Sequence, residues 1–234
     1  RMHFWMDEGF NTFINTFSEA RRYPQKGTEP QREAEQRQQV EQYMTAGYDR
    51  PIDVGSARIN PFLLGENQYT KTSMALHLLR DEVLGDSAFD DGFREYIHRW
   101  AYKHPTPSDF FRTMEDAGGR RLDWFWREFF ETNDQFDQAV DTVVTRTVAD
   151  TEKVTVVYGN LQRGVLPIVG RFTFSDGTTQ DIDYPAESWY MNSVQFMRQY
   201  NFVGKTLTKI ELDPDHRLID VDRTNNTWTA PSSP

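Results

Sequence analysis

The sequence contains no cysteine, and this absence excludes disulfide bonds and thiolate metal ligands. It has no run close to the roughly 20 consecutive apolar residues that a membrane-spanning helix needs, so no membrane partner is expected. Its first residues are aromatic and acidic, and they lack the basic stretch and apolar run of a signal peptide. Basic residues are fewer than acidic ones, 26 against 36, so the formal net charge is −10. A nucleic-acid partner is not expected either, since phosphate binding depends on clustered Lys and Arg.

Several sequence motifs of catalytic sites are missing. The chain has no HExxH, no phosphate-binding glycine loop and no G-x-S-x-G turn. A catalytic zinc site needs three protein ligands and an open fourth position, and the spacing of the five histidines supplies no such set. The printed sequence opens with RMHFW rather than with Met. We therefore expect this chain to begin inside a longer polypeptide.

The composition is that of a folded protein. Hydrophobic residues make up 37% of the chain and aromatic residues 14%, which is enough to build a sizeable core. A length of 234 residues corresponds to one large domain or two small ones. We therefore expect an ordered chain of one or two domains.

Residues 1–148 are expected to be mostly helical. Phe10, Phe13, Ile14 and Phe17 follow the spacing of one apolar helix face. The same patterns, together with start and stop signals such as the glycine after residue 84, predict further helices. These lie at 31–46, 69–84, 87–103 and 109–117, and in the aromatic segment LDWFWREFFE.

The character of the sequence changes at about residue 150. Short β-branched segments such as VTVVYG and KTLTKIELDP alternate with turn signals, and Ser175 to Gly177 has the composition of a hairpin turn. We predict a β-sandwich over residues 151–228 and a disordered tail over 229–234. The expected fold class is α+β in two parts, an all-α helical segment followed by a small β-sandwich.

Two segments carry the most specific functional signal. Glu8 lies in W-M-D-E-G-F, and Tyr69 lies downstream in Q-Y-T-K-T-S-M-A-L-H-L-L-R. This ordered pair resembles the gluzincin zinc aminopeptidases of peptidase family M1, the alanyl and leucyl aminopeptidases and their relatives. The resemblance continues through HPTPSDFFRTMEDAGGRRLDWFWREFF, and the segments SDGT and YPAESW resemble the terminal β-domain of bacterial members.

The resemblance implies roles for both residues. In that family HExxH supplies two zinc ligands, and the Glu of the W-x-(N/D)-E-G-(F/Y) motif, about nineteen residues later, supplies the third. Glu8 would accordingly ligate Zn²⁺. Tyr69 would be the catalytic hydrogen-bond donor to the oxyanion that forms when water attacks a peptide carbonyl. No other cofactor is implied.

The resemblance also implies a context for the chain. The helical segment would be the rear of a thermolysin-like catalytic domain, and the missing N-terminal part of the same polypeptide would carry HExxH. The substrates would be peptides that lose N-terminal residues. The isolated chain is predicted to be inactive and to hold zinc weakly, because one carboxylate does not replace a complete ligand set. The short β tail of bacterial relatives favours a periplasmic or secreted protein.

Other interpretations remain open at this point. Glu8 is also what a helix N-terminus favours electrostatically, and Tyr69 alone reads as an ordinary packed aromatic. His77 is expected to be a packed, hydrogen-bonded histidine rather than a ligand, and Lys71 to support its own turn. The competing function is a non-catalytic interaction module of helices and a β-sandwich. A third interpretation is a degenerate family member that lacks catalysis because its HExxH has been replaced.

Overall fold

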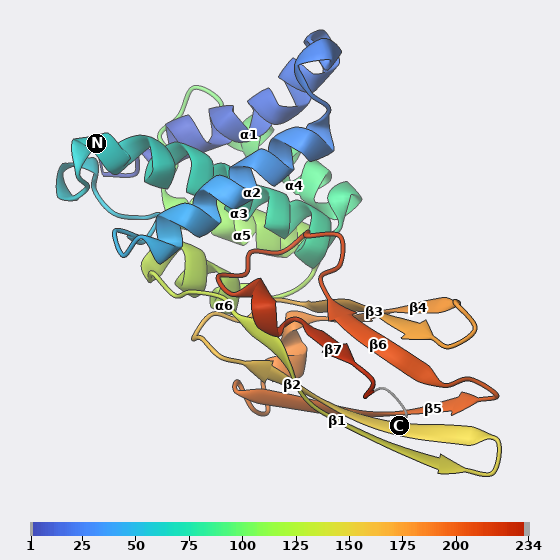
Figure 1. Ribbon diagram of the computed structural model, residues 1–234. Coiled ribbons are helices and arrows are strands. Elements are labelled where there is room, and N and C mark those ends of the chain that lie inside the picture. The colour runs from blue at the N-terminus through green and yellow to red at the C-terminus, as the bar shows by residue number, and fades with distance from the viewer. Residues whose placement is uncertain (1, 232–234) are drawn as a thin grey trace. The chain divides into compact units, whose positions relative to one another are not determined.

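The computed structural model describes residues 2–231, and the chain divides into two compact units between Asp134 and Gln135. The first unit is helical and the second consists mainly of β-strands (Figure 1). Strand β1 (Gln138–Val148) belongs to the second unit, so the change of architecture comes earlier than the position near 150 that the sequence indicated. Among the described helices, none combines the length and the apolar character needed to cross a membrane.

The helical unit contains α-helical, π-helical and 3₁₀-helical segments. A continuous helical run from residue 65 to 84 corresponds to the helix predicted at 69–84, and its central turns are flanked by π-helical ones. The α-helices are α1 (Trp5–Arg22), α2 (Glu29–Thr45), α3 (Thr72–Leu78), α4 (Asp86–Trp100), α5 (Pro107–Gly118) and α6 (Asp123–Trp126). The π-helical segments are η4 (Gly65–Lys71), η5 (Leu79–Leu84) and η6 (Arg127–Glu131), and the 3₁₀ turns are η1 (Pro24–Lys26), η2 (Ser56–Arg58) and η3 (Pro61–Leu63).

Local signals explain where these helices begin and end. Thr106 caps α5, and the Asp109 carboxylate accepts hydrogen bonds from the Thr106 backbone N–H and hydroxyl, both at 2.8 Å. Gly85 ends the run from 65 to 84 with φ of 81°, a conformation that favours glycine. The predicted stop after residue 84 is therefore found.

Aromatic side chains fill the core of the helical unit. Trp5, at the start of α1, is fully buried, and its ring centroid lies 4.7 Å from that of Phe130. Phe10 packs against Phe110 with ring centroids 4.9 Å apart. The five aromatic residues of the segment LDWFWREFFE are all buried, as their density predicted. This core fixes the N-terminal turn of α1.

The second unit is a sandwich of two antiparallel sheets, which confirms the predicted fold class. One sheet has the order β1-β2-β5, and the other has the order β4-β3-β6-β7. Phe172 of β3 packs against Tyr200 and Phe202 of β5, with ring centroids 4.8 and 5.5 Å apart, so these rings join the two sheets. The remaining strands are β2 (Thr151–Asn160), β3 (Ile168–Phe174), β4 (Thr179–Tyr184), β5 (Gln195–Val203), β6 (Leu207–Leu212) and β7 (Thr227–Thr229), with 3₁₀ turns η7 (Ala186–Trp189) and η8 (Arg223–Asn225).

Two details of the sandwich differ from the sequence prediction. Near the end of the predicted sandwich, residues 219–226 form no strand, and β7 begins at Thr227. The predicted tail begins as ordered structure, because Thr229 ends β7 and the Ala230 N–H donates a 2.9 Å hydrogen bond to the Thr208 carbonyl oxygen. Residues 232–234 of that tail lie outside the described part of the chain.

Candidate functional site

Glu8 lies in the first turn of α1, where its side chain is half-buried. Its backbone N–H donates to the Phe4 carbonyl oxygen at 3.2 Å. Within residues 2–231, no side chain forms a hydrogen bond or ion pair with the Glu8 carboxylate. The carboxylate therefore has free acceptor capacity at a position that the aromatic core holds in place.

Gly9 brings α1 into direct contact with the helical run that carries Tyr69. A Cβ atom at Gly9 would lie 2.2 Å from Thr72 Cγ2 and 3.1 Å from the Gln68 carbonyl oxygen. Real Cβ atoms do not approach other atoms as closely as that first distance, so only glycine permits the observed packing. Because residues 68 and 72 lie on either side of Tyr69, this contact holds the Glu8 turn beside the Tyr69 turn.

Tyr69 lies within η4 and is half-buried. Its ring packs edge-on against Phe4, with centroids 6.1 Å apart and an interplanar angle of 67°. Residues four positions apart share one face of a helix, so Phe4 and Glu8 point to the same side of α1. The structure thus places the two predicted site residues along one seam between α1 and η4. Local π-helical geometry is frequent at functional sites.

A loop at residues 49–53 ties this seam together from the η4 side. Lys71 Nζ donates to Asp49 Oδ1 at 2.7 Å and to the Arg50 carbonyl oxygen at 2.9 Å. Gln68 Nε2 donates to the Ile52 carbonyl oxygen at 3.0 Å. These contacts fix the turns before and after Tyr69.

The same loop also holds the start of α1. Asp53 Oδ1 lies 2.6 Å from His3 Nδ1 and accepts a 2.9 Å hydrogen bond from Trp5 Nε1. One short loop therefore positions both the helix that bears Glu8 and the helix that bears Tyr69. No sequence pattern indicates this role, because residues 47–65 show neither a helical nor a strand periodicity.

Lys71 has the structural role that its sequence position indicated. Its side chain is only 1% exposed, and burial lowers the pKa of its ammonium group, while the facing Asp49 carboxylate acts in the opposite direction. A buried ion pair of this kind is costly to break by removing one partner. Asp7, the residue before Glu8, is exposed to solvent, and its carboxylate accepts a 3.3 Å hydrogen bond from Asn11 Nδ2.

Glu8 and the side chains around it supply only part of a zinc site. Glu8 offers one carboxylate oxygen, an appropriate ligand atom for Zn²⁺. Across the described residues, the group of three possible ligand side chains consists of Glu33, His77 and Asp81, and Glu8 is not among them. A zinc site at Glu8 therefore requires ligands from outside residues 2–231.

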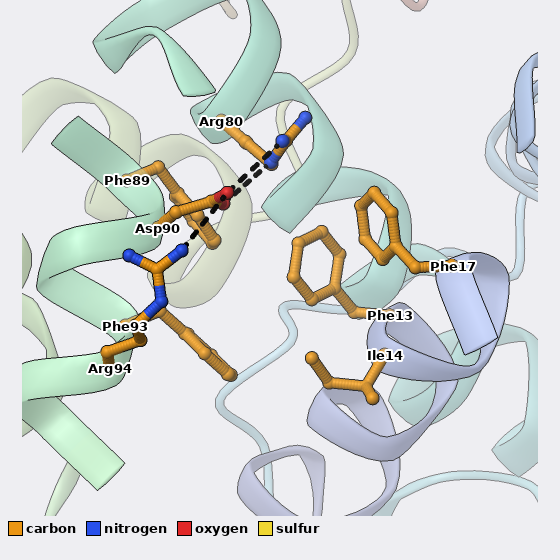
Figure 2. A pocket seen from close by; sticks show the side chains of 8 residues that line it. All are labelled: Phe13, Ile14, Phe17, Arg80, Phe89, Asp90, Phe93 and Arg94. Carbon is orange, nitrogen blue, oxygen red and sulfur yellow. Dashed lines mark hydrogen bonds and ion pairs between the residues drawn. The ribbon is translucent and has the colours of Figure 1, made fainter. Parts of the chain in front are cut away.

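A separate pocket lies on the opposite face of α1. It has a volume of about 240 Å³, and it is mostly apolar with an ionic edge where Arg80 pairs with Asp90 at 2.8 Å (Figure 2). Because it is formed by the Phe13 and Phe17 face of α1, it does not belong to the Glu8 and Tyr69 seam. The lining residues are Phe13, Ile14, Phe17, Arg80, Phe89, Asp90, Phe93 and Arg94.

Comparisons with known proteins bear on the first unit most directly. The sequence profile described as the Peptidase family M1 domain matches residues 2–129. Among solved structures, Legionella pneumophila aminopeptidase A in complex with aspartic acid matches with a TM-score of 0.58 at 13% sequence identity. That match covers 94% of this chain and 24% of the other, so this chain spans about a quarter of its length. A search of curated proteins found no match.

Proposed function

This chain belongs to peptidase family M1, and from that premise we propose that it is the rear part of a zinc-dependent aminopeptidase. The observation that carries the proposal is the close packing of α1, at Gly9 next to the half-buried Glu8, against the turn of η4 that bears Tyr69, whose ring packs on Phe4. Peptides with a free N-terminus are the proposed substrates. The isolated chain is proposed to be inactive, because it supplies one ligand of the metal.

Glu8 is the proposed metal ligand of this chain. Its carboxylate is held on a packed helix and is not engaged by other described side chains, which suits a group that must face an ion. When bound by a complete ligand set, Zn²⁺ lowers the pKa of a bound water and makes it a nucleophile at neutral pH. This chain contributes one carboxylate to the metal site and orients it.

Tyr69 is the proposed hydrogen-bond donor to the oxygen of the scissile carbonyl. Its ring is fixed by Phe4, and its backbone by the contacts of Lys71 and Gln68 with the 49–53 loop. A donor that is already in place pays no reorganisation when negative charge develops on that oxygen. The phenol hydroxyl keeps its proton throughout, and it acts by donating a hydrogen bond.

The proposal is tested in the native polypeptide that includes the segment upstream of Arg1. Glu8→Gln is expected to remove stoichiometric zinc and peptidase activity together, and Glu19→Gln, on the same helix, is the matched control. Glu19 is suitable because it is exposed and paired with Arg32. Full zinc content in the Glu8→Gln protein would contradict the assignment.

Tyr69→Phe tests the second role. It keeps the ring contact with Phe4 and removes the hydroxyl, so zinc content and KM are expected to stay unchanged. The kcat is expected to fall by about 10²–10³, the usual cost of losing one oxyanion donor. Tyr102→Phe, at a fully exposed position, is the control. An unchanged kcat in Tyr69→Phe would show that the tyrosine serves packing alone.

A further inference from the structure

Three side chains from different helical segments meet away from the Glu8 seam. His77 of α3 places Nδ1 3.3 Å from Glu33 Oε1 of α2 and 3.8 Å from Asp81 Oδ2 of η5. All three potential ligand atoms lie within 4.8 Å of one another. His77 is 1% exposed, whereas Glu33 and Asp81 keep some access to solvent. The cluster is therefore closed on the histidine side and open on the carboxylate side.

Thr16 contacts the ring nitrogen of His77 that does not face the carboxylates. The Thr16 hydroxyl donates to the Thr12 carbonyl oxygen at 3.4 Å and accepts from Gln36 Nε2 at 3.2 Å. His77 Nε2 lies 3.3 Å from the same oxygen, and an N–H at Nε2 would donate to it. This leaves Nδ1 as the atom that faces the carboxylates.

Nδ1 of His77 is buried and has no hydrogen-bond partner within the described part of the chain. A protonated Nδ1 would form a charge-assisted hydrogen bond of about 2.7–2.9 Å to one carboxylate. The observed separations of 3.3 and 3.8 Å are longer than that. Metal bonds of about 2.0–2.2 Å in tetrahedral geometry separate ligand atoms by roughly 3.3–3.6 Å, which is close to the 3.3 and 3.8 Å between His77 Nδ1 and the two carboxylate oxygens.

We propose that His77 Nδ1, Glu33 Oε1 and Asp81 Oδ2 bind a divalent transition-metal ion such as Zn²⁺, at a site distinct from Glu8. One neutral imidazole and two carboxylates balance the charge of the ion and belong to the ligand types that zinc prefers. Thr16 orients the ring from behind, as outer partners of metal-binding histidines do. Arg80 binds the other oxygen of Asp81 at 2.7 Å and leaves Oδ2 directed toward His77.

The position of the cluster indicates a structural role for the ion. The buried residues of α2 are Val40, Tyr43 and Met44, all in the second half of the helix. Glu33 belongs to the first half, which polar contacts such as Gln36 with Ser73 hold to the rest of the unit. An ion at Glu33 would therefore attach the N-terminal half of α2 to the run of α3 and η5.

The test is titration of the 234-residue chain with Zn²⁺, and with Co²⁺ for its absorption spectrum, after removal of metals by a chelator. We expect one equivalent to bind and the thermal midpoint to rise. Glu33→Gln and Asp81→Asn are each expected to weaken binding on the order of 10–100-fold or more, judged by how strongly even outer-shell changes act on metal affinity. Glu95→Gln, at an exposed position on α4, is the matched control and should bind as wild type does. Glu8→Gln is measured as well, to separate this site from the Glu8 seam.

A second measurement on the unmodified chain keeps the test independent of mutant folding. Zinc is expected to shift the ¹⁵N resonance of His77 Nδ1, while Nε2 keeps its hydrogen. Absence of saturable binding by wild type, or equal affinity in Glu33→Gln and Asp81→Asn, would overturn the proposal. Loss of binding in Glu8→Gln alone would also overturn it, and would assign the ion to the Glu8 seam.

Discussion

Replacing Gly9 by alanine tests whether the seam between α1 and η4 depends on direct backbone contact. Alanine favours a helix over glycine by about 1 kcal/mol. Against this gain, the new Cβ would lie 2.2 Å from Cγ2 and 2.5 Å from Cβ of Thr72, a fully buried β-branched residue that cannot turn away. Overpacking of this kind costs about 1–3 kcal/mol. With the clash at the upper end of that range, we expect Gly9→Ala to lower the free energy of unfolding by about 1–2 kcal/mol.

The matched control is Gly65→Ala, the same substitution on a neighbouring helical segment. A Cβ at Gly65 would meet no atom within 4 Å. This variant is therefore expected to be neutral or stabilised by about 0.4–1 kcal/mol, because alanine restricts the unfolded chain. Urea unfolding of the two variants, followed by circular dichroism, measures the difference. A Gly9→Ala protein as stable as Gly65→Ala would refute the reasoning that close packing at Gly9 holds Glu8 beside Tyr69.

Three further predictions concern single groups. Lys71→Ala should lower the free energy of unfolding by about 3–5 kcal/mol because Asp49 is left buried without its cation, and adding Asp49→Ala should recover part of the loss, as a double-mutant cycle in urea would show. The Thr106 backbone N–H holds the pKa of Asp109 below its usual 3.8, so the ionised Asp109 carboxylate contributes stability that is lost as the pH falls through its folded-state pKa. When the free energy of unfolding is measured against pH, Asp109→Asn should show a smaller loss of stability in acid than wild type. Burial raises the pKa of Tyr96 from 10.0 to about 12, so its folded form holds the proton more tightly and stability should decrease from pH 10 upward, with less decrease in Tyr96→Phe.

Much of the fold could be predicted because local signals agree with the tertiary structure. The helical period of 69–84, the glycine stop at residue 85 and the hairpin signal at 175–177 each correspond to an observed feature. The resemblance to peptidase family M1 is confirmed by the family match over residues 2–129. These agreements arise where a segment's own pattern determines its conformation.

The parts that could not be predicted depend on contacts between distant segments. β1 is exposed along most of its length, so it lacks the alternation by which a half-buried strand is identified. The loop at 49–53 positions the candidate site through Asp49 and Asp53, whose partners lie far away in the sequence. His77 was expected to be a packed, hydrogen-bonded histidine rather than a ligand. It is buried and lies 3.3 Å from the Thr16 hydroxyl, but its approach to Glu33 depends on the placement of α2 against α3, which the sequence pattern does not show.

The most direct test of the central claim is the amino-acid sequence of the native polypeptide upstream of Arg1, obtained by intact mass and peptide sequencing. We predict HExxH with its second histidine about nineteen residues before Glu8, as the resemblance to peptidase family M1 implies. A native chain that begins near Arg1, or an upstream segment without those two histidines, would contradict the assignment of Glu8 as a zinc ligand and of Tyr69 as a catalytic donor.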